Sequence, residues 1–332
     1  MRRVTVADIM RETGLSRATV DRVLNGRARV HDRTRAVVEE TMARLRSGGE
    51  AVPKPLVADI ALRVGRGMMG QMRAAWTKSG AQGAFHDLHG ADEAMVLRCI
   101  EGLCKDVSRP LIVTAKNSDR LVAVLSNARA KGKRVIALVS DLPPDARNSF
   151  VGVDDRAAGQ TAAFLIGRML GDRPTTVGVV LGNIAFRCHE DREIGFRTGL
   201  RANFPKVVIS GEAQGEDSAD LTRNAVSRLL ADHPALGAIY NVGGGNAGMV
   251  DALRGAGRAA DMLVVGHEVN PVTMPLLRSG AMDFAIAGTP ADLLGGALQC
   301  AVDPSEDAAK GVRHLDFGVY TRFNMPSFTT GA

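Results

Sequence analysis

Two arginines on a short basic segment near the start of the chain have the chemistry to read DNA bases. In a short helix, Val20, Val23 and Leu24 recur at i, i+3 and i+4 and are expected to face inward. The opposite, polar face then carries Arg17 and Arg22. Because an arginine can donate two hydrogen bonds to the O6 and N7 atoms of guanine, this face predicts contacts in a DNA major groove.

Further helices complete this predicted N-terminal domain. The pattern predicts one helix over residues 5–13, a turn at residues 14–16 before the basic helix, and a later helix over residues 32–45, which is helix-turn-helix spacing. Residues 1–55 contain 12 Lys and Arg against 7 Asp and Glu, whereas the rest of the chain contains 30 against 29. The positive charge is therefore local, as expected of a DNA-binding head on a nearly neutral body. The alternative interpretation is a solvated, charged helix face.

The body alternates strand-like apolar runs with amphipathic helical stretches. The apolar runs predict nine strands, over residues 57–64, 110–114, 134–139, 150–153, 176–181, 207–210, 238–240, 262–265 and 284–287. Helices are expected between them, among others over residues 94–104, 157–170 and 221–230. This alternation predicts an α/β fold of two doubly wound parallel-sheet lobes, which we expect to divide near residues 172–174. A single closed barrel is the alternative architecture.

Polar side chains follow several of these expected strands. Ligands of open parallel sheets bind outside the carboxyl ends of the strands, so such residues are candidates for ligand contacts. Five of them outline a polar cleft between the lobes: Lys116, Asp141, Asn183, Asn241 and Glu268.

A glycine-rich segment offers a different chemistry. Gly243, Gly245 and Gly248 match the pattern G-x-G-x-x-G after an expected strand, and Glu268 follows 20 residues later. This pattern is typical of dinucleotide-binding folds, so an NAD-dependent oxidoreductase is the alternative function. No convincing catalytic constellation accompanies the glycines, and we therefore expect neither an enzyme nor a bound cofactor.

Composition excludes several other classes of protein. At 332 residues and 45% hydrophobic content, the chain is long enough for more than one folded core. It has no run of about 18 apolar residues and no apolar signal region at its N-terminus, so we expect a cytoplasmic protein without a membrane partner. Its four cysteines are scattered and predict free thiols. Neither they nor the segments 86–89 and 189–191 have a convincing metal-binding spacing, so we expect no metal site.

Several motifs resemble those of the LacI/GalR (lac repressor) family. In the head they are residues 4–9 and 14–25, Val30 and residues 34–35, and in the body they are residues 150–154, 157–159, 192–197 and 264–268. The resemblance implies a helix-turn-helix DNA-binding domain over residues 1–46, a linker over residues 47–56, and a two-lobed ligand-binding and dimerisation domain over residues 57–332. It implies that this last domain has the fold of periplasmic sugar-binding proteins.

The resemblance also implies roles for individual residues. In the head, ten residues match base-contacting, phosphate-contacting or capping positions: Thr5, Ser16, Arg17, Ala18, Thr19, Asp21, Arg22, Asn25, Arg29 and Thr34. In the body, four polar residues and two aromatic residues are candidates for ligand binding: Asp141, Arg192, Asn241 and Glu268, with Phe186 and Tyr240. Carboxylates and a guanidinium suit a polyhydroxylated ligand because each makes paired hydrogen bonds to neighbouring hydroxyls.

Two features depart from the family pattern. The linker contains Gly48, Gly49, Pro53 and Pro55, which oppose the short hinge helix that the family uses. Gly288 stands where a ligand-contacting glutamine is common in the family. The sequence therefore predicts a homodimeric transcriptional regulator, most simply a repressor of carbohydrate or polyol genes, that binds a pseudo-palindromic operator and a sugar or polyol effector.

Overall fold

The structure is a computed structural model that describes residues 5–13, 15–24, 30, 34–35, 37–38, 41–42, 56–170, 174–303 and 311–326. The chain divides into two compact units, residues 1–55 and 56–332. Two residues with predicted roles, Asn25 and Arg29, lie outside the described residues, as do residues 47–55 of the predicted linker.

The N-terminal unit contains two short helices with well-defined starts. α1 spans Val6–Thr13 and α2 spans Arg17–Leu24, and residues 34–35, 37–38 and 41–42 are also helical. Thr5 Oγ1 accepts a hydrogen bond from Asp8 N at 3.2 Å, and Asp8 Oδ2 accepts one from Thr5 N at 3.0 Å, so the two residues cap α1 reciprocally. Ser16 Oγ accepts a hydrogen bond from Thr19 N at 3.3 Å and so caps the start of α2.

The small core of this unit is apolar, and the predicted polar face is open. Ile9, Val20, Val23 and Val38 are buried together, whereas Leu24, predicted to face inward, is 38% exposed at the end of α2. On the predicted polar face, Arg17, Ala18 and Arg22 are exposed and Asp21 is half-buried, and the candidates Thr19 and Thr34 are also half-buried. The carboxylate of Asp21 lies 3.8 Å from Arg17 Nε, a contact between exposed groups that adds little stability.

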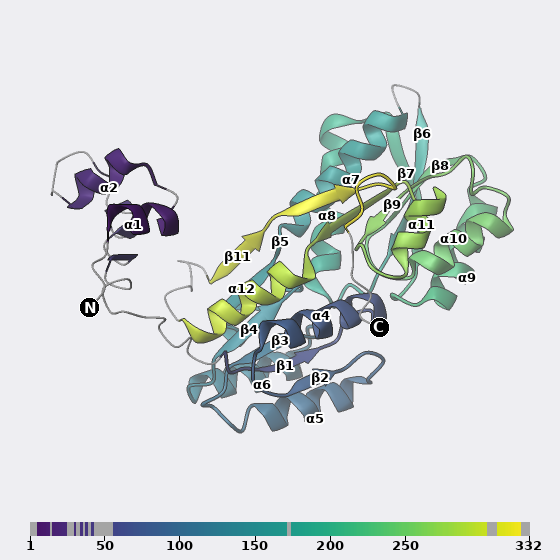
Figure 1. Cartoon of the computed structure of the whole chain (residues 1–332). Coiled ribbons are helices and arrows are strands. Elements are labelled where there is room, and N and C mark those ends of the chain that lie inside the picture. The colour runs from purple at the N-terminus through teal and green to yellow at the C-terminus, as the bar shows by residue number, and fades with distance from the viewer. Residues whose placement is uncertain are drawn as a thin grey trace. The chain divides into compact units, whose positions relative to one another are not determined.

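The first lobe of the body is a six-stranded parallel sheet covered on both faces (Figure 1). Its strands in spatial order are β11 (Val312–Leu315), β5 (Ser149–Val153), β4 (Val135–Leu138), β3 (Leu111–Thr114), β1 (Asp59–Leu62) and β2 (Phe85–Asp87). One face packs against α4 (Arg66–Ser79) and α12 (Pro290–Val302), and the other packs against α5 (Glu93–Leu103) and α6 (Asp119–Ala130). A single 3₁₀ turn, η1 (Pro144–Ala146), lies between β4 and β5.

The second lobe repeats this arrangement. Its strands in spatial order are β12 (Phe317–Tyr320), β10 (Phe284–Gly288), β9 (Leu263–His267), β8 (Leu236–Asn241), β6 (Thr175–Leu181) and β7 (Val207–Gln214), with β12 alone antiparallel. α7 (Asp155–Leu170) and α8 (Arg187–Asn203) cover one face. α9 (Ala219–Asp232), α10 (Asn246–Gly255) and α11 (Thr273–Ser279) cover the other face.

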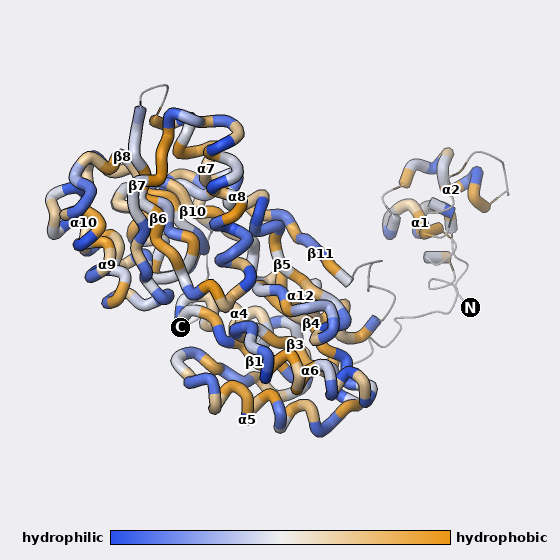
Figure 2. Tube along the Cα trace, turned by 180° about the vertical axis from the view of Figure 1, so that it is seen from behind, coloured by the Kyte–Doolittle hydropathy of each residue, from blue (hydrophilic) through white to orange (hydrophobic). Residues whose placement is uncertain are grey.

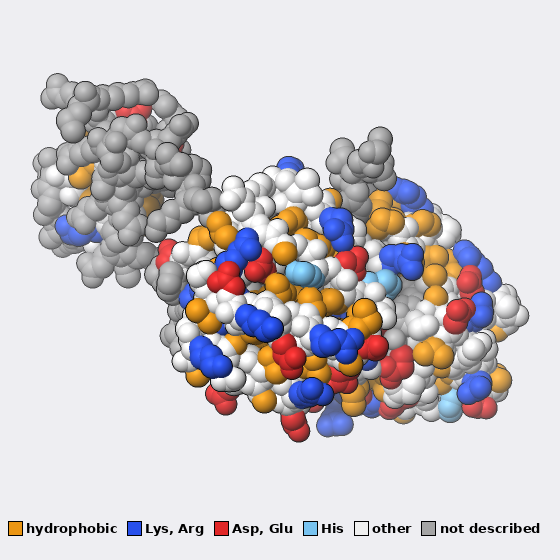
Figure 3. All heavy atoms as spheres, turned by 90° about the horizontal axis from the view of Figure 1, so that it is seen from below, with side chains coloured by type: hydrophobic (Ala, Val, Ile, Leu, Met, Phe, Trp, Pro, Cys, Tyr) orange, Lys and Arg blue, Asp and Glu red, His pale blue; other side chains and the backbone are white. Residues whose placement is uncertain are grey.

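Alternation along the strands explains why both faces of each sheet are covered. In β4, Ile136 and Leu138 pack under α4 and α12, whereas Val135 and Ala137 pack under α5 and α6. All four side chains are buried, and a strand that is buried on both faces is a continuous apolar run. Figure 2 shows such apolar strands inside helices of mixed polarity, and Figure 3 shows basic and acidic side chains interspersed on one face of the body.

The nine predicted strands are confirmed, but the predicted lobe boundary is wrong. The chain first crosses between the lobes directly after β5, so α7 belongs to the second lobe, where it packs against α8. It returns to the first lobe between β10 and α12, and crosses again between β11 and β12. The lobes are therefore not contiguous in sequence, and the alternative of a single closed barrel is wrong.

Glycines allow α7 and α8 to approach closely. A Cβ atom at Gly159 would lie 2.0 Å from Arg192 O, and one at Gly195 would lie 2.1 Å from Arg156 O. Real Cβ atoms do not come this close to backbone oxygens, so only glycine fits at either position.

We therefore expect Gly159→Ala to lower the free energy of unfolding of the body by about 1–3 kcal/mol, because the two helices must move apart. Gly70→Ala is the matched control, since Gly70 lies within α4 and its Cβ would have nothing within 4 Å. This control should be neutral or stabilising, because alanine favours helix. Urea denaturation of the three proteins measures the difference, and equal midpoints for the two variants would contradict the account.

Candidate functional site

A cleft that is open to solvent lies where the two lobes meet. The first lobe contributes residues of α4, the ends of β4 and β5, and the start of α12: Met68, Gln71, Val139, Val153, Pro290 and Leu293. The second lobe contributes Ala158, Arg192, His267, Glu268, Val269, Ile286, Ala287, Gly288 and Phe317. The cleft thus opens at the carboxyl ends of strands, as expected for open parallel sheets.

Two lining residues occupy equivalent positions in the two lobes. Val139 directly follows β4 and Glu268 directly follows β9, and both have positive φ, at 67° and 69°. Each donates its backbone N–H across to the neighbouring strand, Val139 to Val151 O at 2.9 Å and Glu268 to Ile286 O at 3.1 Å. A positive φ costs conformational energy for any residue other than glycine, and most for a β-branched residue such as Val139. Backbone strain of this kind concentrates at ligand-binding sites.

Arg192 carries the positive charge of the cleft. Its Nε donates to Asp155 Oδ1 at 2.7 Å and its Nη1 donates to Val242 O at 3.0 Å, with both side chains of the ion pair below 10% exposed. Burial opposes the charged form of Arg192, but the Asp155 carboxylate, together with Cys188 and Tyr240, outweighs burial and raises the pKa of the guanidinium. Arg192 therefore stays charged at any pH at which the protein is folded.

Glu268 carries the negative charge of the lining. Burial raises the pKa of its carboxyl above the ordinary value, while Arg192 and a hydrogen bond from Asn270 Nδ2, at 2.8 Å to Oε2, act to lower it. The other carboxylate oxygen has no hydrogen bond among those of the described residues, so it is available to accept one from a ligand.

A buried hydrogen bond forms the floor beneath these charges. The hydroxyl of Tyr240 and Nε2 of His267 lie 2.7 Å apart, and both side chains are almost fully buried. The Tyr240 ring also packs on Phe196, with centroids 4.4 Å apart. Burial lowers the pKa of His267 well below its ordinary value, and the nearby Arg192 adds to the effect, so this histidine is neutral near pH 7.

Direct contacts join the lobes around the cleft. Gln71 Nε2 of α4 donates to Val269 O of the second lobe at 3.0 Å, and Asn117 N donates to Ala185 O at 2.7 Å. A Cβ atom at Gly67 would lie 2.5 Å from the side chain of Asn270, so α4 packs closely against the loop after β9. The lobes are therefore in direct contact through α4 and through the loop after β3.

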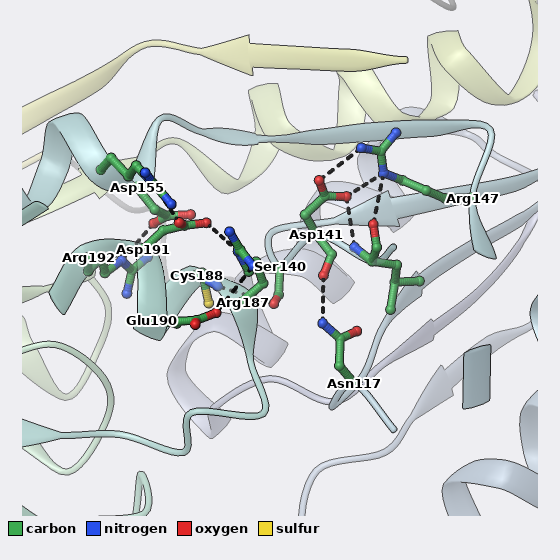
Figure 4. Close-up of polar contacts among 12 residues, drawn as sticks. Asn117, Ser140, Asp141, Arg147, Asp155, Arg187, Cys188, Glu190, Asp191 and Arg192 are labelled. Atoms are coloured by element: carbon green, nitrogen blue, oxygen red, sulfur yellow. Dashed lines mark hydrogen bonds and ion pairs between the residues drawn. The ribbon is translucent and has the colours of Figure 1, made fainter. Parts of the chain in front are cut away.

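Of the six predicted ligand residues, the structure brings Arg192 and Glu268 together in the cleft lining. Asp141 instead forms a two-point ion pair with the buried Arg147, whose Nη2 lies 2.9 Å from Asp141 Oδ2 (Figure 4). Asn241 is fully buried and donates to Gly244 O at 2.8 Å. Tyr240 lies beneath the lining, not in it.

Phe186 takes part in the contact between the lobes. It directly precedes α8 and is half-buried, and the ammonium of Lys116 from the first lobe lies 5.9 Å from its ring centroid. Nearby, Cys188 N approaches Ser140 Oγ at 3.4 Å across the same junction (Figure 4). Burial raises the pKa of Cys188 to about 12, so this cysteine is an unreactive thiol, as predicted.

The glycine-rich segment packs against protein and not against a phosphate. Gly244 N donates to Asp217 Oδ1 at 2.7 Å, which occupies an amide that a dinucleotide would need. Cβ atoms at Gly245 and Gly248 would lie 2.1 Å from Thr222 Oγ1 and 1.8 Å from Ala219 O. These glycines therefore permit close packing of the loop and α10 onto α9, and an anionic pyrophosphate would meet a carboxylate.

Several residues of the site escape sequence reasoning. Gln71 lies in an amphipathic helix, where a glutamine is usually solvated, and Asp155 is one of two consecutive aspartates at a helix start. His267 and Asn270 flank Glu268 in sequence, so proximity to a predicted strand end is the signal that could have found them. The described residues contain no cluster of three or more His, Cys, Asp or Glu that could hold a metal ion.

The buried His267 predicts a pH-dependent stability. As pH falls below about 6.5, the unfolded chain protonates this histidine and the folded chain does not, so stability present above that pH is lost. We expect the free energy of unfolding to fall more steeply between pH 6.5 and 5 in the wild type than in His267→Gln, by up to about 1.4 kcal/mol per pH unit. Burial also lowers the pKa of His189, but this residue contributes equally to the pH dependence of both proteins and does not affect the difference between them.

Urea denaturation at half-unit pH intervals measures these slopes. Glu268 contributes with the opposite sign, because its raised pKa stabilises the fold at low pH, and it does so in both proteins. Parallel curves for wild type and variant would show that His267 is not held neutral.

Comparison with known proteins places the body among binding proteins. The model of the periplasmic binding protein domain family matches residues 110–303. The D-ribose/D-allose-binding protein of Pseudomonas aeruginosa is 27% identical over 199 residues, which cover 57% of this chain and only 60% of that protein. The D-allose-binding periplasmic protein of Escherichia coli is 26% identical over 216 residues, which cover 62% of this chain and 69% of that protein.

Solved structures show the same fold. GanP, a glucose-galactose binding protein from Geobacillus stearothermophilus, superposes with a TM-score of 0.72 at 16% identity, over 82% of this chain and 99% of GanP. The expected fold of periplasmic sugar-binding proteins is thus confirmed for the two-lobed body. In the described parts of the chain, no helix is long and apolar enough to cross a membrane.

These relatives correct the predicted function. They are solute-binding proteins, which contradicts a DNA-binding transcriptional regulator and equally the alternative of an NAD-dependent oxidoreductase. The expectation of a cytoplasmic protein is contradicted by the same family match and by the periplasmic relative. That the chain is not an enzyme is confirmed, because the family and its relatives bind solutes without catalysis. The family model spans more than half of the chain, and the chain belongs to the periplasmic binding protein domain family.

Proposed function

We propose that the body binds a monosaccharide in the cleft between its lobes. The observation that carries this proposal is that Arg192 and Glu268, one charged donor and one charged acceptor, line the same small cleft at the ends of strands. Neighbouring hydroxyls of a sugar both donate and accept hydrogen bonds, so a guanidinium beside a carboxylate matches them.

Both charged groups retain hydrogen-bonding capacity. A guanidinium has five N–H donors, and the hydrogen bonds of Arg192 to Asp155 and Val242 use two of them. Glu268 Oε2 is engaged by Asn270, which leaves Oε1 for the ligand. Because Asp155 already neutralises Arg192, the cleft carries no uncompensated positive charge, which favours a neutral sugar over a sugar phosphate.

The relatives support the same class of ligand. The two curated relatives are named for D-ribose and D-allose, and GanP is named for glucose and galactose. For this chain we assign direct contacts to Arg192, Glu268 and Gln71. Tyr240 and Asn241 support the lining through their hydrogen bonds to His267 and Gly244. Asp141 holds the loop after β4 in place through its ion pair with Arg147.

Contacts between the lobes suggest how binding changes the shape of the body. Gln71 lines the cleft and also donates a hydrogen bond to Val269 O of the opposite lobe. The same side chain would therefore contact the sugar and hold the two lobes together. A sugar that touches both lobes binds the closed arrangement more tightly than an open one and shifts the population toward it.

Glu268→Gln tests the role of the carboxylate. The amide keeps the size of the side chain but loses its charge, and hydrogen bonds to charged groups contribute about 1.5–3 kcal/mol. We therefore expect the dissociation constant for the bound sugar to rise about 10- to 100-fold. Isothermal titration calorimetry with D-ribose, D-allose, D-glucose and D-galactose measures the change.

Glu93→Gln serves as the matched control, because Glu93 is an exposed residue at the start of α5 and does not line the cleft. It should bind sugar as the wild type does. Saturable binding that survives unchanged in Glu268→Gln would remove the carboxylate from the site, and no binding of any sugar by the wild type would overturn the proposed function.

A further inference from the structure

Most side chains that line the cleft are apolar. Four lining side chains carry nitrogen or oxygen: Gln71, Arg192, His267 and Glu268. Three of these four come from α8 and the end of β9. The remaining lining side chains are hydrocarbon, apart from the thioether of Met68 and the bare backbone of Gly288.

One group of these apolar residues, which we call the apolar end, lies where the chain crosses between the lobes. Val153 ends β5 at the first crossing, Pro290 and Leu293 begin α12 at the second, and Phe317 begins β12 at the third. Gly288 adds no polar group there, because a Cβ atom would lie 2.7 Å from Val153 Cγ1. This end of the cleft therefore offers no side-chain hydrogen-bonding group to a ligand.

The polar side chains of the lining are themselves partly engaged by protein contacts. Gln71 Nε2 is engaged by Val269 O, and His267 Nε2 by the Tyr240 hydroxyl. Among the hydrogen bonds of the described residues, the capacity that remains lies on Gln71 Oε1, Glu268 Oε1 and the other N–H groups of Arg192. Side-chain hydrogen-bonding capacity for a ligand is therefore confined to these three residues.

We propose that the ligand is a 6-deoxyhexose, whose methyl group lies against Val153, Leu293 and Phe317 while its ring hydroxyls face Arg192 and Glu268. This inference rests on the proposed function. A hydroxymethyl group at the apolar end would find no side-chain partner, whereas a methyl group there gains from burial. A sugar with one apolar end matches the few polar side chains of the lining better than a fully hydroxylated sugar does.

Matched pairs of sugars that differ in a single oxygen test the proposal on the full chain. The pairs are 6-deoxy-D-allose and D-allose, D-fucose and D-galactose, and D-quinovose and D-glucose. Calorimetric titration should show that, in the pair with the correct ring stereochemistry, the deoxy sugar binds about 10- to 100-fold more tightly. A parent hexose that binds as tightly as its deoxy partner, or more tightly, overturns this inference and leaves the proposed function standing. Failure of all six sugars to bind also overturns this inference, and failure of D-ribose as well overturns the proposed function.

Val153→Thr locates the methyl group. The substitution keeps the shape of a half-buried side chain and places a hydroxyl at the apolar end, so the preference for the deoxy sugar should fall at least fivefold, roughly the value of one hydrogen bond. Val124→Thr on α6, which packs against the core of the first lobe, is the control and should keep the wild-type preference. An unchanged preference in folded Val153→Thr contradicts the assigned position of the methyl group.

Discussion

The cleft depends on the buried ion pair between Arg192 and Asp155. A guanidinium removed from water is stable only with a close counter-charge and further hydrogen bonds, which Asp155 and Val242 O supply. Asp155 is the first residue of α7, directly after the chain enters the second lobe, so the pair ties this crossing to α8. Because Gly159 and Gly195 let α7 and α8 pack backbone to backbone, the charge is held at the cleft and not at the surface.

The second constraint is the likeness of the two lobes. Each lobe has the same strand order, and each places a residue of positive φ after the fourth strand along the chain, Val139 in one lobe and Glu268 in the other. The lobes differ in the chemistry of that position, because one presents a hydrocarbon and the other a carboxylate. Glu268 is one of three polar lining side chains that the second lobe contributes, whereas the first lobe contributes only Gln71.

Sequence patterns predict the strands well because a strand buried on both faces is a continuous apolar run, as Val135–Leu138 shows. They miss β11 because Arg313 and His314 interrupt its apolar pattern, and they misplace the lobe boundary because α12 returns to the first lobe after the second is built. Arg192 and Glu268 are predictable from their motifs, but the pairing of Asp141 with Arg147 depends on the path of a loop. The basic N-terminal helices predict DNA binding, which the solute-binding relatives of the body contradict.

The most direct test of this account is a crystal structure of the body with a bound sugar, chosen from those that bind in solution. The account predicts sugar hydroxyls within about 2.7–3.2 Å of the Arg192 guanidinium and the Glu268 carboxylate, with the ion pair between Arg192 and Asp155 intact. A sugar bound elsewhere, or one that takes Arg192 away from Asp155, would contradict the central claim that a pre-formed ion pair presents the ligand site.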